Sequence, residues 1–125
     1  MKQTLNIRIT LNWSEWTPGD EVDKADIPNA PGVYEVKYEG SSEKRLTIGK
    51  ASNLRMRVKH GLVKGSVPHS TGERIREKED TSKLLVRWAM TDRPAAAEEE
   101  LLRRYFEKFN ELPKYAKCPK YVKCS

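Results

Sequence analysis

Hydrophobic and polar residues alternate strictly near the start of the chain. The apolar positions of this run are Leu5, Ile7, Ile9, Leu11 and Trp13. A period of two predicts a half-buried strand. Residues 14–31 follow as an acidic connector in which prolines and glycines interrupt any regular element. We therefore expect residues 1–30 to form an N-terminal strand and connector ahead of the main domain.

Three further strands are predicted from shorter alternating runs. They cover residues 33–38, 45–49 and 84–90, and residues 39–43 form a hairpin loop between the first two. In the strand at 45–49, Leu46 and Ile48 should point toward the core and Thr47 toward the opposite face, because successive side chains of a strand alternate.

Two main helices complete the pattern. Leu54, Val58 and Leu62 recur every four residues and form one apolar face of a helix that Ser52 caps. Residues 65–81 are polar and basic, with a short helix expected over 72–79. Pro94 opens a last helix that runs to about residue 110. This order of elements predicts a small α/β sandwich in which helices flank a sheet.

Composition limits the class of protein. The 125 residues form one domain, with 37% hydrophobic and 34% charged residues. No apolar run approaches the roughly 18 residues that cross a membrane, and the N-terminus lacks the pattern of a signal peptide. We expect a cytoplasmic protein that does not bind membranes, and no obligatory protein partner is evident.

Positive charge is concentrated in the middle of the chain. Residues 44–78 carry ten lysines and arginines against two glutamates, a local net charge of +8, whereas residues 1–30 carry a net charge of −2. Clustered positive charge is expected for a nucleic-acid partner, although an ordinary solvated surface is the plainer alternative. The polar and basic residues that we expect to contact nucleic acid are Asn53, Arg55, Lys59, Lys64, Arg74 and Arg76.

The C-terminal segment is basic and repetitive. Pro113-Lys-Tyr-Ala-Lys-Cys118 is followed directly by Pro119-Lys-Tyr-Val-Lys-Cys124. Duplication of this hexad explains both cysteines without a disulfide, and a zinc site would need further ligands. Residues 112–125 contain four lysines and no acidic residue. We expect them to act as a flexible arm, ending in a basic tail at 117–125 that strengthens nucleic-acid binding.

One glutamate lies on the apolar face of the last predicted helix. On a helical wheel Glu98 falls between Leu102 and Tyr105, whereas the two glutamates that follow it point toward solvent. Burying an ionised carboxylate costs several kcal/mol unless a metal ion or a basic group pairs with it. The alternative is that Glu98 complements the helix dipole in the first turn and stays hydrated.

Three short motifs, in the correct order, resemble the signature of the GIY-YIG nucleases. They are Pro31-Gly-Val-Tyr34, Thr47-Ile-Gly-Lys-Ala-Ser-Asn-Leu-Arg-Met-Arg57 and Glu98-Glu-Glu-Leu101-Leu102. The resemblance implies a GIY-YIG-like catalytic domain over residues 31–116, with a central three-stranded antiparallel sheet flanked by helices and the N-terminal strand as an addition. It also implies hydrolysis of DNA phosphodiester bonds with one divalent ion, Mg²⁺ or Mn²⁺.

The resemblance assigns roles to particular residues. Glu98 matches the metal-binding glutamate, Arg57 matches an arginine that clamps the phosphate, and Tyr34 matches a tyrosine that activates water. A phenol is a poor base at neutral pH, and we expect Lys50 and Arg57 to lower the pKa of Tyr34. His60, one position early relative to the family pattern, is expected to assist. By pattern alone, Tyr34 would be a core aromatic and His60 a surface residue.

This sequence departs from the family pattern at functional positions. Thr47 replaces the second tyrosine and is included among the catalytic candidates, Gly61 stands where the family has a histidine or tyrosine, and Ala116 replaces an asparagine. Two functions therefore stay open: a divalent-metal-dependent DNA endonuclease, or a nucleic-acid-binding module on the same fold with weak or no cleavage. A basic RNA-associated structural protein is a third possibility, which leaves the motifs as coincidence.

Overall fold

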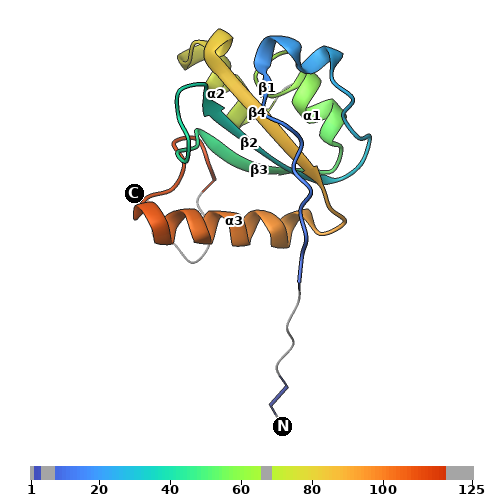
Figure 1. Ribbon diagram of the computed structural model, residues 1–125, viewed down its shortest axis with the longest axis vertical. Helices are drawn as coiled ribbons and strands as arrows, with labels where there is room; N and C mark the ends of the chain where they lie inside the picture. The colour runs from blue at the N-terminus through green and yellow to red at the C-terminus, as the bar shows by residue number, and fades with distance from the viewer. Residues whose placement is uncertain (1, 4–7, 66–68, 118–125) are drawn as a thin grey trace.

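The computed structural model of the chain describes residues 2–3, 8–65 and 69–117. Its strands and helices are interspersed along the chain (Figure 1). They are β1 (Thr17–Pro18), the short 3₁₀ helix η1 (Gly19–Lys24), β2 (Gly32–Tyr38), β3 (Thr47–Ala51), α1 (Leu54–His60), α2 (Ser70–Lys78), η2 (Thr81–Lys83), β4 (Leu84–Met90) and α3 (Pro94–Phe109). Among the described residues, no helix is long and apolar enough to span a membrane.

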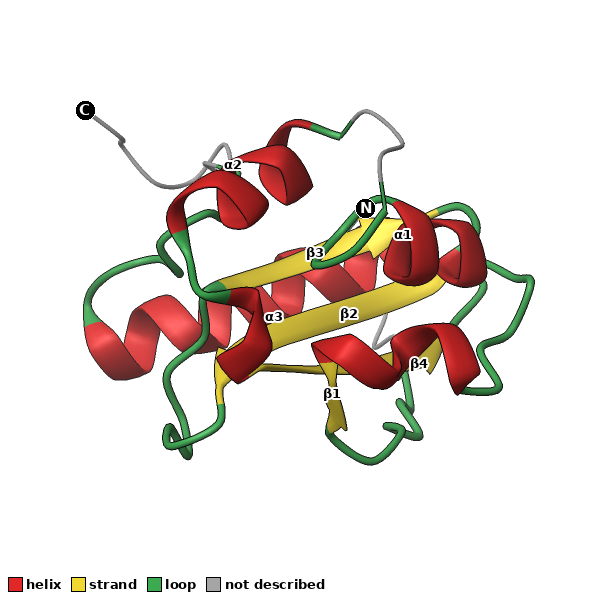
Figure 2. Cartoon of the chain, turned by 90° about the horizontal axis from the view of Figure 1, so that it is seen from above, coloured by secondary structure: helices red, strands yellow, loops and turns green. Residues whose placement is uncertain are grey.

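The strands form one antiparallel sheet in the order β1-β4-β2-β3. The helices α1 and α2 lie on one side of this sheet and α3 lies on the other (Figure 2). The predicted α/β sandwich with flanking helices is therefore confirmed. Because β3 pairs only with β2, it forms one edge of the sheet, between the two helical layers.

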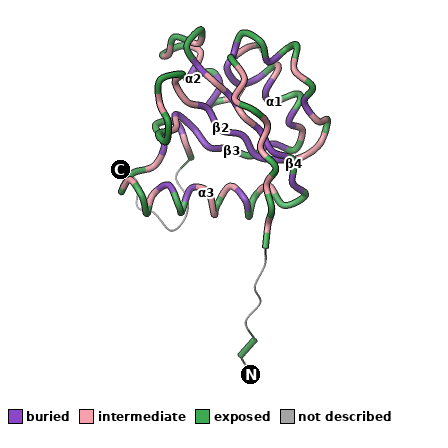
Figure 3. Tube along the Cα trace, viewed as in Figure 1, coloured by how far each residue is buried: buried purple, intermediate pink, exposed green. Residues whose placement is uncertain are grey.

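Alternation along β2 divides the core between the two faces of the sheet. Tyr34 and Val36 pack toward α1, within the main hydrophobic cluster that includes Leu54 and Val58. Val33 packs on the other face against the start of α3. Buried residues accordingly concentrate in the strands and on the helix sides that face them (Figure 3).

The predicted N-terminal strand is wrong over its described part. Residues 8–13 have no strand pairing, and the sheet gains the two-residue β1 further along. Ile9, Leu11 and Trp13 are nevertheless half-buried against the α3 face of the sheet. The alternation therefore reflects which side chains are buried and not a ladder of backbone hydrogen bonds. Residues 4–7 of the predicted strand lie outside the described residues.

Leu46 and Ile48 do not share a face, contrary to the prediction. Leu46 packs in the main core and Ile48 packs against α3. The backbone N–H of Leu46 donates to the carbonyl of Val36 at 2.7 Å, while Thr47 is the register partner of the same residue. Two residues thus oppose one, as in a β-bulge, which turns the Leu46 side chain over.

The C-terminal segment packs on the domain further along the chain than predicted. Tyr115 is 2% exposed, and its N–H donates to the carbonyl of Leu46 at 2.8 Å. Its hydroxyl donates to Glu79, which also accepts from Tyr38 and from Lys114. The expected flexible arm is therefore wrong for residues 112–116. The two cysteines, and all of the basic tail except Lys117, lie outside the described residues.

Candidate functional site

A cavity of 390 Å³ lies at the β3 edge of the sheet, where the two helical layers meet. Its wall includes residues from β2, β3, α1, α3 and the approach to α2, together with the C-terminal segment. The lining side chains that carry a hydroxyl, a phenol, an imidazole or a charge include Tyr34, Thr47, Lys50, Arg57, His69, Glu98 and Lys117. Five of the six predicted catalytic residues therefore meet in one place.

The Tyr34 side chain lies across a glycine on the neighbouring strand. Tyr34 pairs with Gly49, and a methyl carbon added to Gly49 would lie 2.5 Å from the Tyr34 hydroxyl oxygen. Because Gly49 has no side chain, the phenol ring of Tyr34 can occupy this space at the strand edge. This explains in physical terms why the Ile-Gly-Lys segment of the second motif carries a glycine.

Burial controls the ionisation of Tyr34. The residue is 2% exposed. Desolvation raises the pKa of its phenol to about 12, an effect that the charge of Arg57 opposes and the charge of Glu98 reinforces. The predicted lowering of this pKa is wrong, because loss of water around a buried phenolate outweighs one nearby cation. At neutral pH Tyr34 is therefore a protonated hydrogen-bond donor.

Arg57 presents an unpaired donor to this region. It belongs to α1, which is capped by Asn53 and not by the predicted Ser52. The Asn53 side chain accepts from the Met56 N–H at 3.0 Å. The Arg57 Nη1 atom is buried and has no hydrogen-bond partner among the described residues. An unpaired buried donor on a cation is costly, so an anionic ligand is the natural partner for it.

Glu98 faces the cavity from the first turns of α3. The carboxylate is half-buried, as expected from its place on the apolar face of the helix. Burial raises the pKa of Glu98, while the charges of Lys50 and Lys117 and the backbone amide of Lys50 oppose that rise. A cation held at this carboxylate would therefore stabilise its ionised form.

The lining of the cavity fits a hard metal ion bound through few protein ligands. Among its described lining residues Glu98 is the only carboxylate, and in the described part of the chain no three His, Cys, Asp or Glu side chains gather into a metal cluster. Mg²⁺ commonly binds through one or two carboxylates, keeps several waters and takes further oxygens from a phosphate. The residues present fit such an ion and do not fit zinc, which usually has three or four protein ligands.

Thr47 and Lys50 reach the cavity from opposite faces of β3. Thr47 is 2% exposed and lies on the Tyr34 face, whereas Lys50 is exposed on the α3 face. Both line the cavity because it wraps around the strand edge. Asn110 is exposed and ends α3 in the left-handed conformation at φ 55°, and it does not line the cavity.

The histidine that lines the cavity is not the one that the sequence predicted. His60 is exposed at the end of α1 and does not line the cavity, so its expected assistance to Tyr34 stays a prediction. His69 lines the cavity instead and caps α2. Sequence reasoning missed His69 because it precedes a different helix. The only signal that pointed to it was that the chain has just two histidines.

The residues predicted to bind nucleic acid lie on α1 and α2 or next to them, and none of them lines the 390 Å³ cavity. Several of them already make contacts within the domain. Arg55, Lys59, Lys64 and Arg76 donate to the backbone carbonyls of Ile27, Asp23, Asp20 and Leu62, and Arg74 lies over the ring of Tyr115. Part of the central positive charge therefore joins α1 and α2 to neighbouring segments.

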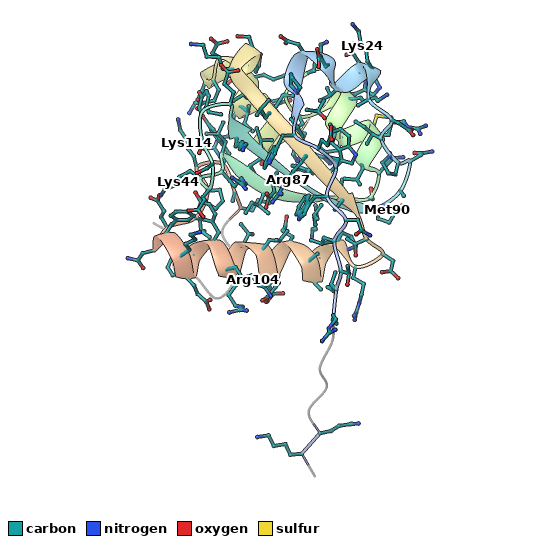
Figure 4. All side chains as sticks on the ribbon, viewed as in Figure 1. Lys24, Lys44, Arg87, Met90, Arg104 and Lys114 are labelled. Atoms are coloured by element: carbon teal, nitrogen blue, oxygen red, sulfur yellow. The ribbon has the colours of Figure 1, made fainter. Side chains whose placement is uncertain are left out.

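A second charged cluster lies on the α3 face of the sheet. Glu35 is 4% exposed and pairs with Arg45 at 2.9 Å and with Arg87 at 2.6 Å. Trp13 and Trp16 stack on Arg87, which lies over the middle of the sheet in Figure 4. The buried carboxylate is thus fully paired, which is what a buried charge requires. This cluster holds the N-terminal segment to the sheet.

The chain is similar to UvrABC system protein C of Christiangramia forsetii. The two are 30% identical over 97 residues, which cover 78% of this chain and 16% of that protein. The chain therefore matches a small part of the length of this relative. No protein-family model and no solved structure gives a significant match.

Proposed function

We propose that the chain is a GIY-YIG-type endonuclease that hydrolyses DNA phosphodiester bonds with one divalent ion, Mg²⁺ or Mn²⁺. The observation that carries this proposal is the buried Nη1 of Arg57, which has no hydrogen-bond partner in the described part of the chain. Its side chain lines the same cavity as Glu98 and Tyr34. The similarity to UvrABC system protein C, which contains a GIY-YIG domain, supports the relationship to nucleases.

In this proposal Arg57 binds the scissile phosphate. A guanidinium is always charged at physiological pH and can hold two phosphate oxygens with parallel hydrogen bonds. Its buried position strengthens the interaction, because water screens it less. The same charge stabilises the additional negative charge that develops on the phosphate in the transition state.

Glu98 is the residue that would hold the divalent ion. When bound, the ion supplies positive charge to the phosphate and to the leaving oxygen. Lys50 contributes a second positive charge beside Glu98 at the same edge. Because one carboxylate is a weak site by itself, we expect the free protein to bind Mg²⁺ poorly and to bind it more tightly together with nucleic acid.

Tyr34 orients the attacking water through its hydroxyl group. With its pKa raised to about 12, the phenol keeps its proton at neutral pH and does not act as the general base in the protein alone. Thr47 lines the same cavity, and in this proposal its hydroxyl holds a water molecule there. His60 has no part in this arrangement, since it lies outside the cavity lining.

The test compares Glu98→Gln with Glu99→Gln, a change of the same chemistry at the next residue. Wild type should nick supercoiled plasmid or branched DNA with Mg²⁺ or Mn²⁺ and not with chelator. Glu98→Gln should lose this activity while keeping DNA binding, and Glu99→Gln should stay active. Full activity of Glu98→Gln, or equal losses in both variants, would contradict the proposed metal residue.

A DNA-binding module without cleavage is the second candidate. The observations that favour it are Thr47 and Ala116, at positions where the family has a tyrosine and an asparagine. Thr47→Tyr separates the two functions. In an active enzyme it should leave cleavage similar or reduced, because Thr47 is already buried. In a decayed enzyme, wild type should be inert and Thr47→Tyr with Ala116→Asn should gain activity.

A further inference from the structure

His69 lies at a junction that the three motifs do not describe. It lines the 390 Å³ cavity and also a smaller cavity of 70 Å³ beside it, and Arg57 lines both as well. The two side chains come from different segments of the chain, Arg57 from α1 and His69 from the residue that precedes α2. An anion that reaches the Arg57 guanidinium therefore enters a space that His69 also borders.

The hydrogen bond at the start of α2 determines which nitrogen of His69 carries its proton. The Nδ1 atom accepts from the backbone N–H of Gly72 at 3.2 Å. A ring nitrogen that accepts a hydrogen bond bears no hydrogen, so the neutral imidazole is protonated on Nε2. No described residue accepts from that Nε2–H group, which leaves it as a donor for a ligand.

Two glycines bring this histidine to the site. A methyl carbon added to Gly72 would lie 2.0 Å from the carbonyl oxygen of Gly61, so the end of α1 and the start of α2 touch through their backbones. Gly61 also lines the smaller cavity beside His69. The position that lacks an imidazole or phenol on α1 is therefore the point where α2 approaches and supplies an imidazole.

We infer that His69 is a phosphate-binding residue of this site, whose Nε2–H donates to a non-bridging oxygen of the phosphodiester that Arg57 holds. The inference rests on the proposed function and extends its binding site to a second helix. It also explains why α2 is capped by histidine, since the nitrogen that caps the helix leaves the other nitrogen oriented as a donor.

The experiment uses the fact that the chain has two histidines. Each imidazole signal in the NMR spectrum can be assigned with His60→Asn and His69→Asn. Asparagine is a preferred N-cap residue, so His69→Asn keeps an acceptor for the Gly72 N–H while it removes the Nε2 donor. Inorganic phosphate and a short oligothymidylate are then titrated into wild type and Arg57→Gln.

We expect the His69 signal to shift saturably with both probes, the His60 signal to stay in place, and Arg57→Gln to abolish the shift. Cleavage by His69→Asn should fall about 10- to 100-fold, the usual effect of losing a hydrogen bond to a charged group, at a Tm near that of wild type. His60→Asn should cleave normally.

Two results would overturn the inference. One is an unmoved His69 signal under conditions where Arg57 binds phosphate, and the other is full activity of His69→Asn at an unchanged Tm. If wild type cleaves no substrate, the proposed nuclease function fails, and the NMR titration alone decides whether His69 binds phosphate.

Discussion

Substituting Gly49 by alanine would test the geometry of the site at a single atom. The added methyl carbon would lie 2.5 Å from the Tyr34 hydroxyl oxygen and 2.6 Å from the ring carbon that bears it. Both distances are far inside van der Waals contact. Tyr34 is buried in the main core, so its ring has little room to move away except outward into the cavity. Gly49→Ala should therefore displace the hydroxyl.

The size of the effect follows from two opposing contributions. Overpacking a core costs about 1–3 kcal/mol, whereas replacing glycine in a strand interior gains roughly 0.5–1 kcal/mol from lower backbone entropy in the unfolded chain. We expect a net loss of about 1–2 kcal/mol, a fall in Tm of roughly 4–8 °C for a domain of this size. Cleavage should fall more steeply, by about 100-fold, because a catalytic group misplaced by 1 Å has an effect of that order.

Thermal unfolding and plasmid nicking are measured on Gly49→Ala, Tyr34→Leu and the double variant. Leucine lacks the outer ring atoms that collide with the new methyl group, so Gly49→Ala should cost little stability in the Tyr34→Leu background. Gly40→Ala is the control, since a carbon added there meets no atom within 4 Å. An equal cost of Gly49→Ala in both backgrounds, or no cost in either, would refute this account of the site.

Three further predictions address charge. Arg57→Gln should reduce cleavage far more than Arg55→Gln. Arg55→Gln removes the same charge, but it loses a hydrogen bond to a backbone carbonyl and should mainly lower the Tm. Equal losses of activity would show that Arg57 only attracts DNA through its charge. Lys114, Tyr115 and Tyr38 lower the pKa of Glu79 from 4.5 to about 2, so its stabilisation is present above about pH 4.5 and is lost as the pH falls toward 2. Glu79→Gln should flatten the dependence of Tm on pH across that range, and an unchanged acid transition would contradict the pairing. Removing residues 117–125 should weaken DNA binding most at low salt without lowering the Tm, because the anchor at Tyr115 remains; a large drop in Tm would show that the tail packs on the domain.

The sequence by itself determined those features that depend on local periodicity and motif spacing. The alternation in residues 33–38 and 84–90 identified both central strands, because half-buried strands need a period of two. The helical wheel put Glu98 on the buried face of α3, since 3.6 residues per turn leaves no other place for it. The motif spacing brought Tyr34, Arg57 and Glu98 to one cavity, as expected from the resemblance.

Tertiary structure decided what depends on contacts between distant segments. The N-terminal apolar residues are buried without strand pairing, because α3 and the sheet together offer them a surface to pack on. His69 replaces His60 at the cavity because two glycines let α1 and α2 touch, a contact that neither helix encodes alone. Tyr34 has a raised pKa because the fold removes water from its phenol. How deeply a side chain is buried depends on residues far away in the sequence, and its neighbours along the chain do not determine it.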